Sequence, residues 1–348
     1  MHKEGTFVGK QKKVRPTPVG QSDVRKVPIW VFLLVGAAFL IFFLVQWLIS
    51  LTNSYFNAFI LRDSTVSEAA AHMSGLTPNA SEQTKLLPVQ KEWDLFTSAR
   101  LRDEVRITAK DGTELHGYLY DEGSPVTVVV LPRFNLDGTA DFLPGSALHE
   151  LTGCNILLPD PRAHGESGGT YFGFGYLEQY DLAAWLTWAE QYLEGEQVFL
   201  LWGEGVGANT ILFSAANGLL PDSAVLAVAE SPYLSVHQLA EANLWKWYQL
   251  PAFPFLYTIE NKLARSAAGF TEEDTELLPV LSGSDAALPV LFLRSGGDEY
   301  IRPEWTASVY DAYPGPKEMI SGGLTHGTAF VACRTEILKW VEAIINEH

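Results

Sequence analysis

The chain has 348 residues, of which 47% are hydrophobic and 19% charged, and it contains 10 Trp, 13 Tyr and 19 Phe. This much apolar surface excludes an intrinsically disordered chain. The formal net charge is −17, so the chain lacks the excess of Lys and Arg that neutralises the phosphates of a nucleic acid. Nucleic acid is therefore not expected as a partner. Two cysteines, Cys154 and Cys333, are too few for a disulfide-dense scaffold or a CxxC site, and whether they pair is left open.

An uncharged apolar segment follows a basic N-terminus. Residues 1–28 carry seven Lys or Arg against Glu4 and Asp23, a net charge of +5. Ile29 to Leu51 is 23 residues without a charge, which as a helix spans about 35 Å. A secretory signal peptide is the alternative, but its apolar region is shorter and ends in an A-x-A-like site, which this segment lacks. We therefore expect an uncleaved transmembrane helix, a cytoplasmic tail and an extracellular globular part in the cell membrane.

The segment after the apolar stretch differs in composition. Ser64 to Gln90 is rich in Ser, Thr, Ala and Pro and has no clear period, which is typical of a tether with one short helix. We expect residues 52–100 to form this extracellular tether and residues 101–348 to form the globular domain.

Alternation of short apolar runs with helical segments predicts an α/β fold. Residues 103–108 and 114–120 flank Asp111-Gly112 and predict an antiparallel hairpin. Later runs are almost continuously apolar, as in parallel strands covered by helices on both faces. We predict these strands at residues 127–131, 155–158, 198–202, 224–229, 289–293 and 317–320, and helices at 176–193, 207–217, 303–313 and 329–345. An aromatic, helical excursion at about residues 233–285 predicts a lid.

One strand end runs into a helix through closely spaced glycines. Residues 201–208 read LWGEGVGA, the outline of a G-x-S-x-G nucleophile elbow, with Gly203 and Gly207 as the outer glycines and Gly205 where the serine would stand. A dinucleotide-binding loop is the alternative, because glycine-rich turns before a helix also hold phosphates. That loop normally follows the first strand, whereas this one follows the fifth.

Several further stretches support the hydrolase interpretation. They are LLPDPRAHGESGG at 157–169, GFGYLEQYDLAAWLTW at 173–188, LPAFPFL at 250–256, LFLRSGGDEYI at 291–301 and GLTHGTAF at 323–330. With the elbow, they make the chain from about Glu104 to the C-terminus resemble the α/β-hydrolase family, specifically membrane-anchored bacterial serine hydrolases related to serine aminopeptidases. The resemblance implies a mostly parallel sheet of about eight strands, helices on both faces and a short helical lid.

The same resemblance implies the site residues. Asp298, after a late strand, corresponds to the triad acid, and His326, after the last strand, corresponds to the base. The carboxylate would fix the imidazole tautomer, and the imidazole would take the nucleophile's proton. The oxyanion donors would be the backbone N–H groups of Phe134 and Val206. Family members usually have His-Gly where this chain has Pro132-Arg133, so the site departs from the pattern at two places.

Other chemistries at this site are less well supported. Glycine offers no atom for covalent catalysis. Glu204 as nucleophile would place Trp202 and Val206 where small residues are needed, whereas a water activated by His326 and Asp298 is conceivable. Ser231 is interpreted as a turn or capping residue.

The segment from Asp160 to Gly169 offers three metal-ligand residue types within one short loop. Asp160, His164 and Glu166 are too few and too close together for a defined site, so no metal is expected, and no cofactor is expected either. We interpret the segment as a structural turn in which Arg162 and His164 hydrogen-bond loop backbone.

The sequence thus predicts a membrane-anchored α/β-hydrolase-fold protein without its nucleophile. It would act as a binding or regulatory module for an acyl or peptide-like ligand. The alternatives are a slow hydrolase of ester or amide bonds that uses activated water, and a surface scaffold with no ligand.

Overall fold

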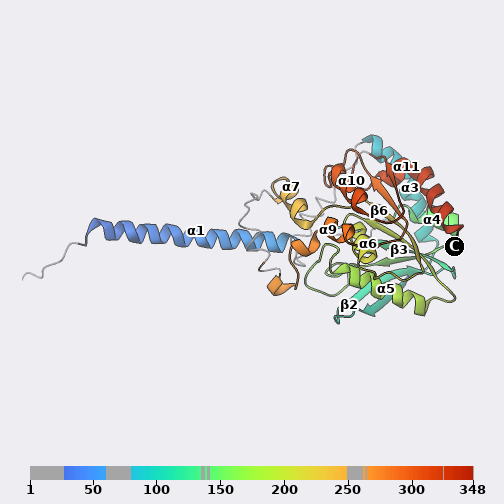
Figure 1. Cartoon of the computed structure of the whole chain (residues 1–348), viewed down its shortest axis with the longest axis horizontal. Helices are drawn as coiled ribbons and strands as arrows, with labels where there is room; N and C mark the ends of the chain where they lie inside the picture. The colour runs from blue at the N-terminus through green and yellow to red at the C-terminus, as the bar shows by residue number, and fades with distance from the viewer. Residues whose placement is uncertain are drawn as a thin grey trace, which may run out of the picture. The chain divides into compact units, whose positions relative to one another are not determined.

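The structure is a computed structural model that describes residues 27–59, 80–134, 138, 142–248, 262, 265–323 and 325–347 (Figure 1). By its internal contacts the chain divides into two units, Met1–Trp47 and Leu48–His348. We describe each unit by itself.

The first unit contains most of one long helix. This helix, α1 (Ile29–Phe59), has 31 residues, and its segment Ile29–Thr52 is long and apolar enough to cross a membrane. Large apolar side chains such as Phe32, Leu40 and Phe43 are exposed along it, an arrangement that a bilayer would cover. The predicted apolar segment at 29–51 is therefore helical, and the helix continues eight residues further.

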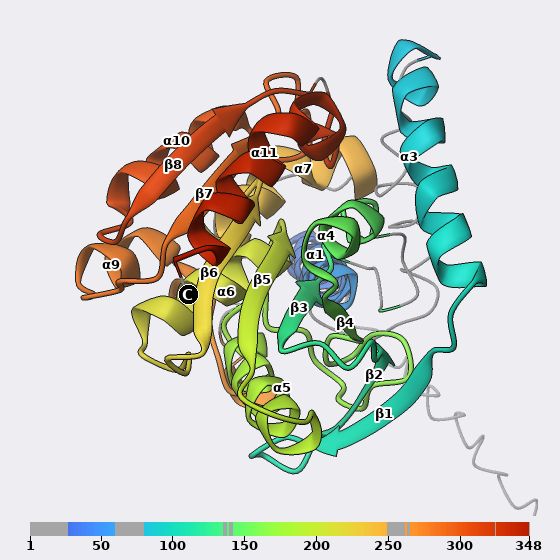
Figure 2. The ribbon, with the colours of Figure 1, turned by 90° about the vertical axis from the view of Figure 1, so that its right-hand side faces the viewer.

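The second unit is built on an eight-stranded sheet of order β1-β2-β4-β3-β5-β6-β7-β8. β2 pairs with both β1 and β4 in antiparallel fashion, and all other neighbouring strands are parallel. In Figure 2 the strands fan from β1 at the lower right to β8 at the upper left. The strands are β1 (Asp103–Thr108), β2 (Glu114–Tyr120), β3 (Val126–Leu131), β4 (Asn155–Pro159), β5 (Val198–Glu204), β6 (Ala224–Glu230), β7 (Val290–Arg294) and β8 (Lys317–Ser321). All eight predicted strands are confirmed to within two residues.

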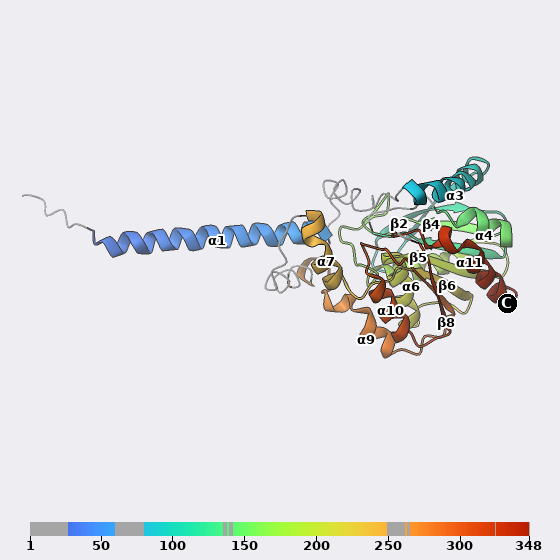
Figure 3. The same cartoon turned by 90° about the horizontal axis from the view of Figure 1, so that it is seen from above.

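Helices cover both faces of this sheet because alternate strand residues point to opposite sides. Val129 and Leu201 lie in one buried cluster with α5, α6, α9 and α10, whereas Val128 and Leu200 lie in another with α3, α4 and α11. In Figure 3, α3 and α9 lie at opposite sides of the unit. The helices are α3 (Ala80–Ser98), α4 (Gly145–Thr152), α5 (Glu178–Tyr192), α6 (Val206–Ala216), α7 (Val236–Tyr248), α9 (Leu277–Ser282), α10 (Pro303–Ala312) and α11 (Ala329–Ile345). The two-sided α/β architecture predicted from the sequence is confirmed.

The segment expected to be a tether differs from the prediction. Residues 80–98 form the 19-residue helix α3, and its Val89, Trp93 and Phe96 are buried in the core. Trp93 packs edge-on against Tyr120 and Phe142, with ring centroids 6.1 and 6.0 Å apart. This apolar face attaches the helix to the sheet, so residues 80–98 belong to the folded unit. Residues 60–79 lie outside the described residues.

The expected lid region at about residues 233–285 has two kinds of structure. α7 lies within it, followed after a gap by the short 3₁₀ helix at Glu273–Thr275. In α9, Leu277 and Leu281 are fully buried in the same cluster as α6, so these residues form part of the core and not of a lid. Residues 249–261, including the whole LPAFPFL stretch, lie outside the described residues.

Candidate functional site

The elbow predicted from LWGEGVGA is a tight strand-to-helix turn. β5 ends at Glu204, α6 begins at Val206, and Gly205 between them has φ 56° and ψ −108°, a conformation that L side chains rarely adopt. The Gly205 N–H donates to the Glu230 carbonyl over 2.8 Å, and its own carbonyl accepts from the Asn209 N–H over 3.0 Å. The turn is therefore held at both sides by backbone hydrogen bonds.

The three glycines of the elbow have different steric surroundings. A Cβ at Gly207 would lie 1.9 Å from the Leu131 carbonyl oxygen, and one at Gly203 would lie 2.4 Å from Gly207. These two positions exclude any side chain because β3, β5 and α6 meet there. At Gly205, in contrast, the nearest atoms to a Cβ are Ile301 Cδ1 at 3.6 Å, Arg133 Cβ at 3.7 Å and His326 Nε2 at 4.0 Å. The apex therefore has room for a side chain that it lacks.

His326 and Asp298 lie together beside this apex. His326 Nδ1 is 2.7 Å from Asp298 Oδ2, and both side chains are buried. The other carboxylate oxygen accepts from the N–H groups of Tyr300 and Ile301 over 2.9 and 2.8 Å. The Ser231 hydroxyl donates to Oδ2 over 3.0 Å. Ser231, interpreted from the sequence as a turn or capping residue, therefore also helps to orient the acid.

Burial and charge act in opposite directions on this pair. Burial alone would raise the pKa of Asp298, but the charge and hydrogen bond of His326 and the backbone donors bring that pKa below its ordinary value. Burial alone would lower the pKa of His326, but Asp298 and then Glu204 raise it above its ordinary value. The pair thus favours an imidazolium beside a carboxylate.

A second ion pair, between Arg133 and Glu204, lies beside His326. Arg133 Nη1 donates to Glu204 Oε1 over 2.7 Å, and the two side chains are 25% and 20% exposed, so solvent reaches them. The same Glu204 oxygen lies 3.4 Å from His326 Nε2. Among the residues that the structure describes, His326 Nε2 and Arg133 Nε have no hydrogen-bond partner. His326 Nε2 thus lies within ion-pair distance of Glu204 without an aligned hydrogen bond to it.

Glu230 is a titratable group at the site that sequence reasoning missed. It is the last residue of β6, lies opposite Glu204 in the β5–β6 register, and is only 3% exposed. Its Oε1 accepts from the Ala329 N–H over 3.1 Å. Burial, and then the charge of Glu204, raise the pKa of Glu230 to about 8. The signal in the sequence is a carboxylate that ends a fully apolar strand.

The residues expected to supply oxyanion donors also lie at this edge of the sheet. Val206 is the first residue of α6, a position whose N–H has no partner within the helix. Phe134 follows β3, and its ring packs against Phe172 and Phe174 with centroids 5.2 and 5.5 Å apart. These rings belong to an apolar cluster that also contains Val206, Tyr300 and Ile301. The cluster gives the site an aromatic wall.

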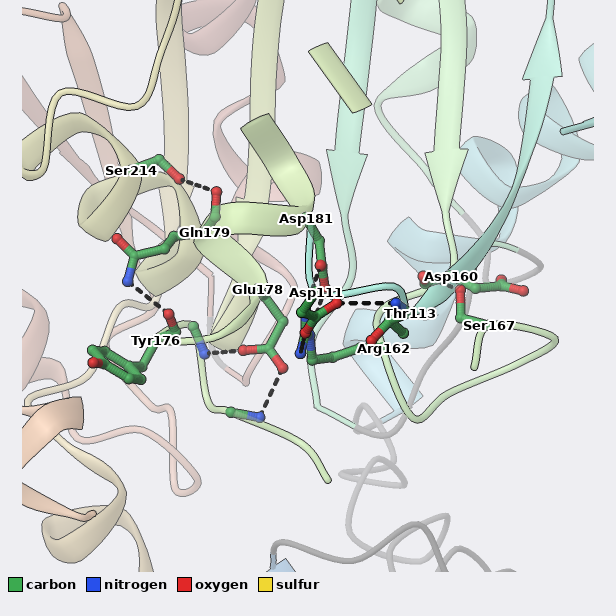
Figure 4. Close-up of polar contacts among 12 residues, drawn as sticks. Asp111, Thr113, Asp160, Arg162, Ser167, Tyr176, Glu178, Gln179, Asp181 and Ser214 are labelled. Carbon is green, nitrogen blue, oxygen red and sulfur yellow. Dashed lines mark hydrogen bonds and ion pairs between the residues drawn. The ribbon is translucent and has the colours of Figure 1, made fainter. Parts of the chain in front are cut away.

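The segment at residues 160–169 has a structural arrangement. Arg162 pairs with both oxygens of Asp181, at 2.7 and 2.6 Å, and with Asp111 at 3.0 Å (Figure 4). The expectation that Arg162 would hydrogen-bond loop backbone is therefore wrong, because the buried carboxylate of Asp181 and the exposed one of Asp111 attract its guanidinium. His164 Nδ1 does lie 3.0 Å from a backbone carbonyl, that of Arg162.

Asp160 is one of the three residues in that segment whose side chains could bind a metal. Both of its carboxylate oxygens contact other groups of the protein. One oxygen accepts from the Gly138 N–H over 2.7 Å and the other lies 2.7 Å from His116 Nδ1. Within the described ranges, no group of three or more His, Cys, Asp or Glu is arranged to hold a metal ion. Cys154 and Cys333 are both free, which answers the question of their pairing.

Comparisons with solved structures fit this arrangement. An esterase of Pyrococcus furiosus, Pf2001, superimposes with a TM-score of 0.58 at 21% identity over 73% of this chain and 96% of that one. The α/β hydrolase GrgF from Penicillium sp. sh18 gives 0.53 at 20% identity over 71% and 99%. The second unit has the α/β-hydrolase fold. The predicted fold class is thus confirmed.

Sequence comparisons add one relative. Over 258 residues the chain is 27% identical to an uncharacterized protein of Bacillus subtilis (strain 168), YqkD, which covers 73% of this chain and 83% of that protein. No family model matches the chain. Within the α/β-hydrolase fold, the elbow, Asp298 and His326 come from the ends of β5, β7 and β8.

Proposed function

We propose that this chain is a membrane-anchored α/β-hydrolase-fold protein that lacks a nucleophile and serves as a binding or regulatory module. Its ancestry would lie among serine hydrolases related to serine aminopeptidases. Residues 1–28 would be cytoplasmic and the globular part extracellular. The observation that carries the proposal is Gly205, an apex with no side-chain atom, facing an intact pair of His326 and Asp298.

The chemistry follows from what glycine cannot do. A serine hydrolase forms an acyl-enzyme because its hydroxyl oxygen attacks the carbonyl carbon while histidine takes the proton. In an enzyme of this kind, loss of the serine alone lowers turnover by about a million-fold. The backbone N–H donors do not depend on the serine side chain. What remains at the site therefore supports recognition of an acyl or peptide-like ligand better than it supports turnover.

One observation favours a second candidate, a slow hydrolase. His326 Nε2 has no hydrogen-bond partner among the described residues and faces the open apex, so it could take a proton from a water that adds to an ester or amide carbonyl. The leaving group would then receive that proton. The raised pKa of His326 disfavours this route, because it lowers the fraction of neutral imidazole, the form that can accept a proton.

Two measurements on the unaltered chain separate these functions. Membranes that contain the full-length protein are treated with a fluorescent fluorophosphonate, with a serine hydrolase as positive control. We expect no labelling of this chain, and strong labelling would contradict the proposal. Purified protein is assayed with p-nitrophenyl butyrate, and multiple turnovers that disappear in His326→Ala would support the slow hydrolase instead.

A third measurement separates a binding module from a scaffold. Thermal unfolding is followed with a panel of acyl and peptide-like compounds, because a ligand that binds only the folded state raises the melting temperature. We expect at least one such compound to stabilise the protein by several degrees. A panel without any effect would favour a scaffold that binds no small ligand.

A further inference from the structure

The end of the apolar segment in α1 is packed into the second unit. This unit begins at Leu48, so it includes the last residues of Ile29–Thr52, the segment that is long and apolar enough to cross a membrane. Leu51 is 8% exposed and Thr52 is 2% exposed, whereas Ile49 is 50% exposed. One side of the helix is therefore covered by protein where the apolar segment ends.

The protein that covers Leu51 is an apolar cluster at one edge of the sheet, which we call the edge cluster. Val206 follows β5, Tyr233 follows β6 and Ile301 follows β7, and all three are buried in it with Leu51. Phe172, which comes after β4, is buried there as well. These four strands run parallel, so their carboxyl ends meet at the same edge of the sheet. The end of the apolar segment therefore lies at the carboxyl edge.

The candidate functional site borders the same cluster. The Cδ1 atom of Ile301 lies 3.6 Å from the position of a Cβ at Gly205. The ring of Tyr300, another member of the cluster, has its centroid 4.9 Å from that of His326. The side chains that cover the end of the apolar segment are thus also neighbours of the elbow and of the imidazole.

The length of the apolar segment gives the depth of this edge in a membrane. Its 24 residues rise about 36 Å as a helix, whereas the hydrocarbon core of a bilayer is about 30 Å thick. The last four residues, about 6 Å of helix, therefore extend into the head-group layer. Leu51 and Thr52 are among them, so the edge cluster that covers Leu51 lies at the level of the head groups.

We propose that the second unit rests on the membrane with the carboxyl edge of its sheet, so that the neighbour of the edge that carries Gly205 and His326 is the lipid head-group layer. The inference rests on the membrane anchor of the proposed function and adds the surface on which the candidate site lies. The opposite arrangement, in which the unit stands away from the lipid on a free tether, would require Leu51 to leave the edge cluster.

Exposed cations border this edge. Arg302 follows Ile301, and its guanidinium carbon lies 5.5 Å from the ring centroid of Trp305, a further member of the edge cluster. The side chain of Arg265 is 70% exposed and lies 4.0 Å from that of Asp274. Guanidinium groups at a membrane surface can donate hydrogen bonds to lipid phosphates. The head-group layer thus offers partners to both arginines.

Exposed positions at the two edges of the sheet allow a direct comparison. Thr170→Cys and Arg302→Cys place a thiol beside the edge cluster, at the carboxyl edge. Glu196→Cys and Asp222→Cys place it just before β5 and β6, at the amino edge. The seven residues of β5 separate the two edges by about 20 Å.

The measurement is quenching of a fluorophore by a lipid that carries a nitroxide on its head group. Each full-length variant also carries Cys333→Ser, so that only the buried Cys154 remains besides the new thiol. The protein is labelled with bimane and placed in phosphatidylcholine nanodiscs with and without the nitroxide lipid. Because about 20 Å separates the edges, we expect quenching at residues 170 and 302 to be at least about twofold stronger than at 196 and 222. Equal quenching at both edges, or stronger quenching at the amino edge, would overturn the proposal.

A matched pair of variants tests the contact that holds the edge at the lipid. Leu51→Asn and Ile49→Asn make similar changes at nearly the same depth, but only Leu51 is buried in the edge cluster. With the label at residue 302, Leu51→Asn should remove about half or more of the quenching, because an amide is poorly accommodated among apolar side chains. Ile49→Asn should leave the quenching nearly unchanged. Equal effects of the two changes would overturn the proposal.

Entry into the nanodiscs tests the anchor separately. A full-length chain that does not enter them would contradict both the membrane anchor of the proposed function and this inference. A chain that enters them, shows no difference between the two edges and is not labelled by a fluorophosphonate would reject this inference alone and leave the proposed function standing.

Discussion

A Cβ at Gly205 would lie 4.0 Å from Nε2 of His326. From there, a serine hydroxyl could reach the imidazole within hydrogen-bond distance. His326 in turn is held by Asp298 at 2.7 Å, and Asp298 by two backbone N–H groups and Ser231. An imidazole oriented by a buried carboxylate therefore lies within reach of a side chain at residue 205.

Glu230 should make the stability of the protein fall as the pH rises. Because its folded-state pKa is raised from 4.5 to about 8, the folded state binds more protons than the unfolded state between these values, and the free energy of unfolding decreases with pH there. At about 1.4 kcal/mol per unit the effect has an upper limit of about 5 kcal/mol.

Glu230→Gln should remove most of this fall, because glutamine does not titrate and keeps an oxygen for the Ala329 N–H. Urea unfolding of the variant and the unaltered protein at pH 5 and pH 8 measures the difference. The same pH dependence in both proteins would show that Glu230 is not its source.

Arg162 should be essential for stability although it lies away from Gly205. Its bidentate pair with Asp181 is buried on both sides, and removal of one partner leaves an uncompensated buried charge. Arg162→Ala should therefore lower the free energy of unfolding by about 3 to 5 kcal/mol.

The control is Arg106→Ala, because Arg106 pairs with Glu166 and both side chains are more than half exposed. This change should cost about 1 kcal/mol or less. Similar losses in the two variants, measured by denaturant unfolding, would contradict the importance that we assign to the buried pair.

Gly207 should not tolerate even alanine. A Cβ there would lie 1.9 Å from the Leu131 carbonyl oxygen, so α6 would have to move away from β3. We expect Gly207→Ala to cost about 3 kcal/mol or more. Gly296→Ala is the matched control, because nothing lies within 4 Å of a Cβ at that position. A melting temperature of Gly207→Ala equal to that of the control would refute the close approach.

The N-terminal helix should hold the protein in the membrane with its globular part outside. When the full-length chain is expressed in a bacterium, we expect it to resist alkaline carbonate extraction, as an integral protein does. Proteinase K added to spheroplasts should digest the globular part and leave an N-terminal tag protected. Protection of the globular part in intact spheroplasts would reverse the proposed orientation.

Much of the fold could be predicted because its signals are local. β6 reads AVLAVAE and all seven of its residues are buried, as its apolar run predicts. α3 was missed because its buried Val89, Trp93 and Phe96 lie in a polar helix that contains Pro88. α4 has only eight residues, too few for a clear period.

The site was predictable in part for the same reason. The order of Gly205, Asp298 and His326 along the chain follows the α/β-hydrolase pattern. The Arg133–Glu204 pair and the position of Glu230 depend on strand register, since Leu131 lies opposite Gly203 and Glu204 opposite Glu230. Such proximity between distant segments has no signal in a single sequence.

The most direct test of the central claim is the mass of Gly205→Ser after treatment with a fluorophosphonate. Serine at φ 56° costs about 1 to 3 kcal/mol, so circular dichroism first checks that the variant is folded. We expect one adduct, mapped to residue 205 and absent from Gly205→Ser/His326→Ala, and no adduct on the unaltered protein. A folded Gly205→Ser that stays unmodified, or an adduct at this site in the unaltered protein, would contradict the claim that Gly205 is what deprives the site of covalent chemistry.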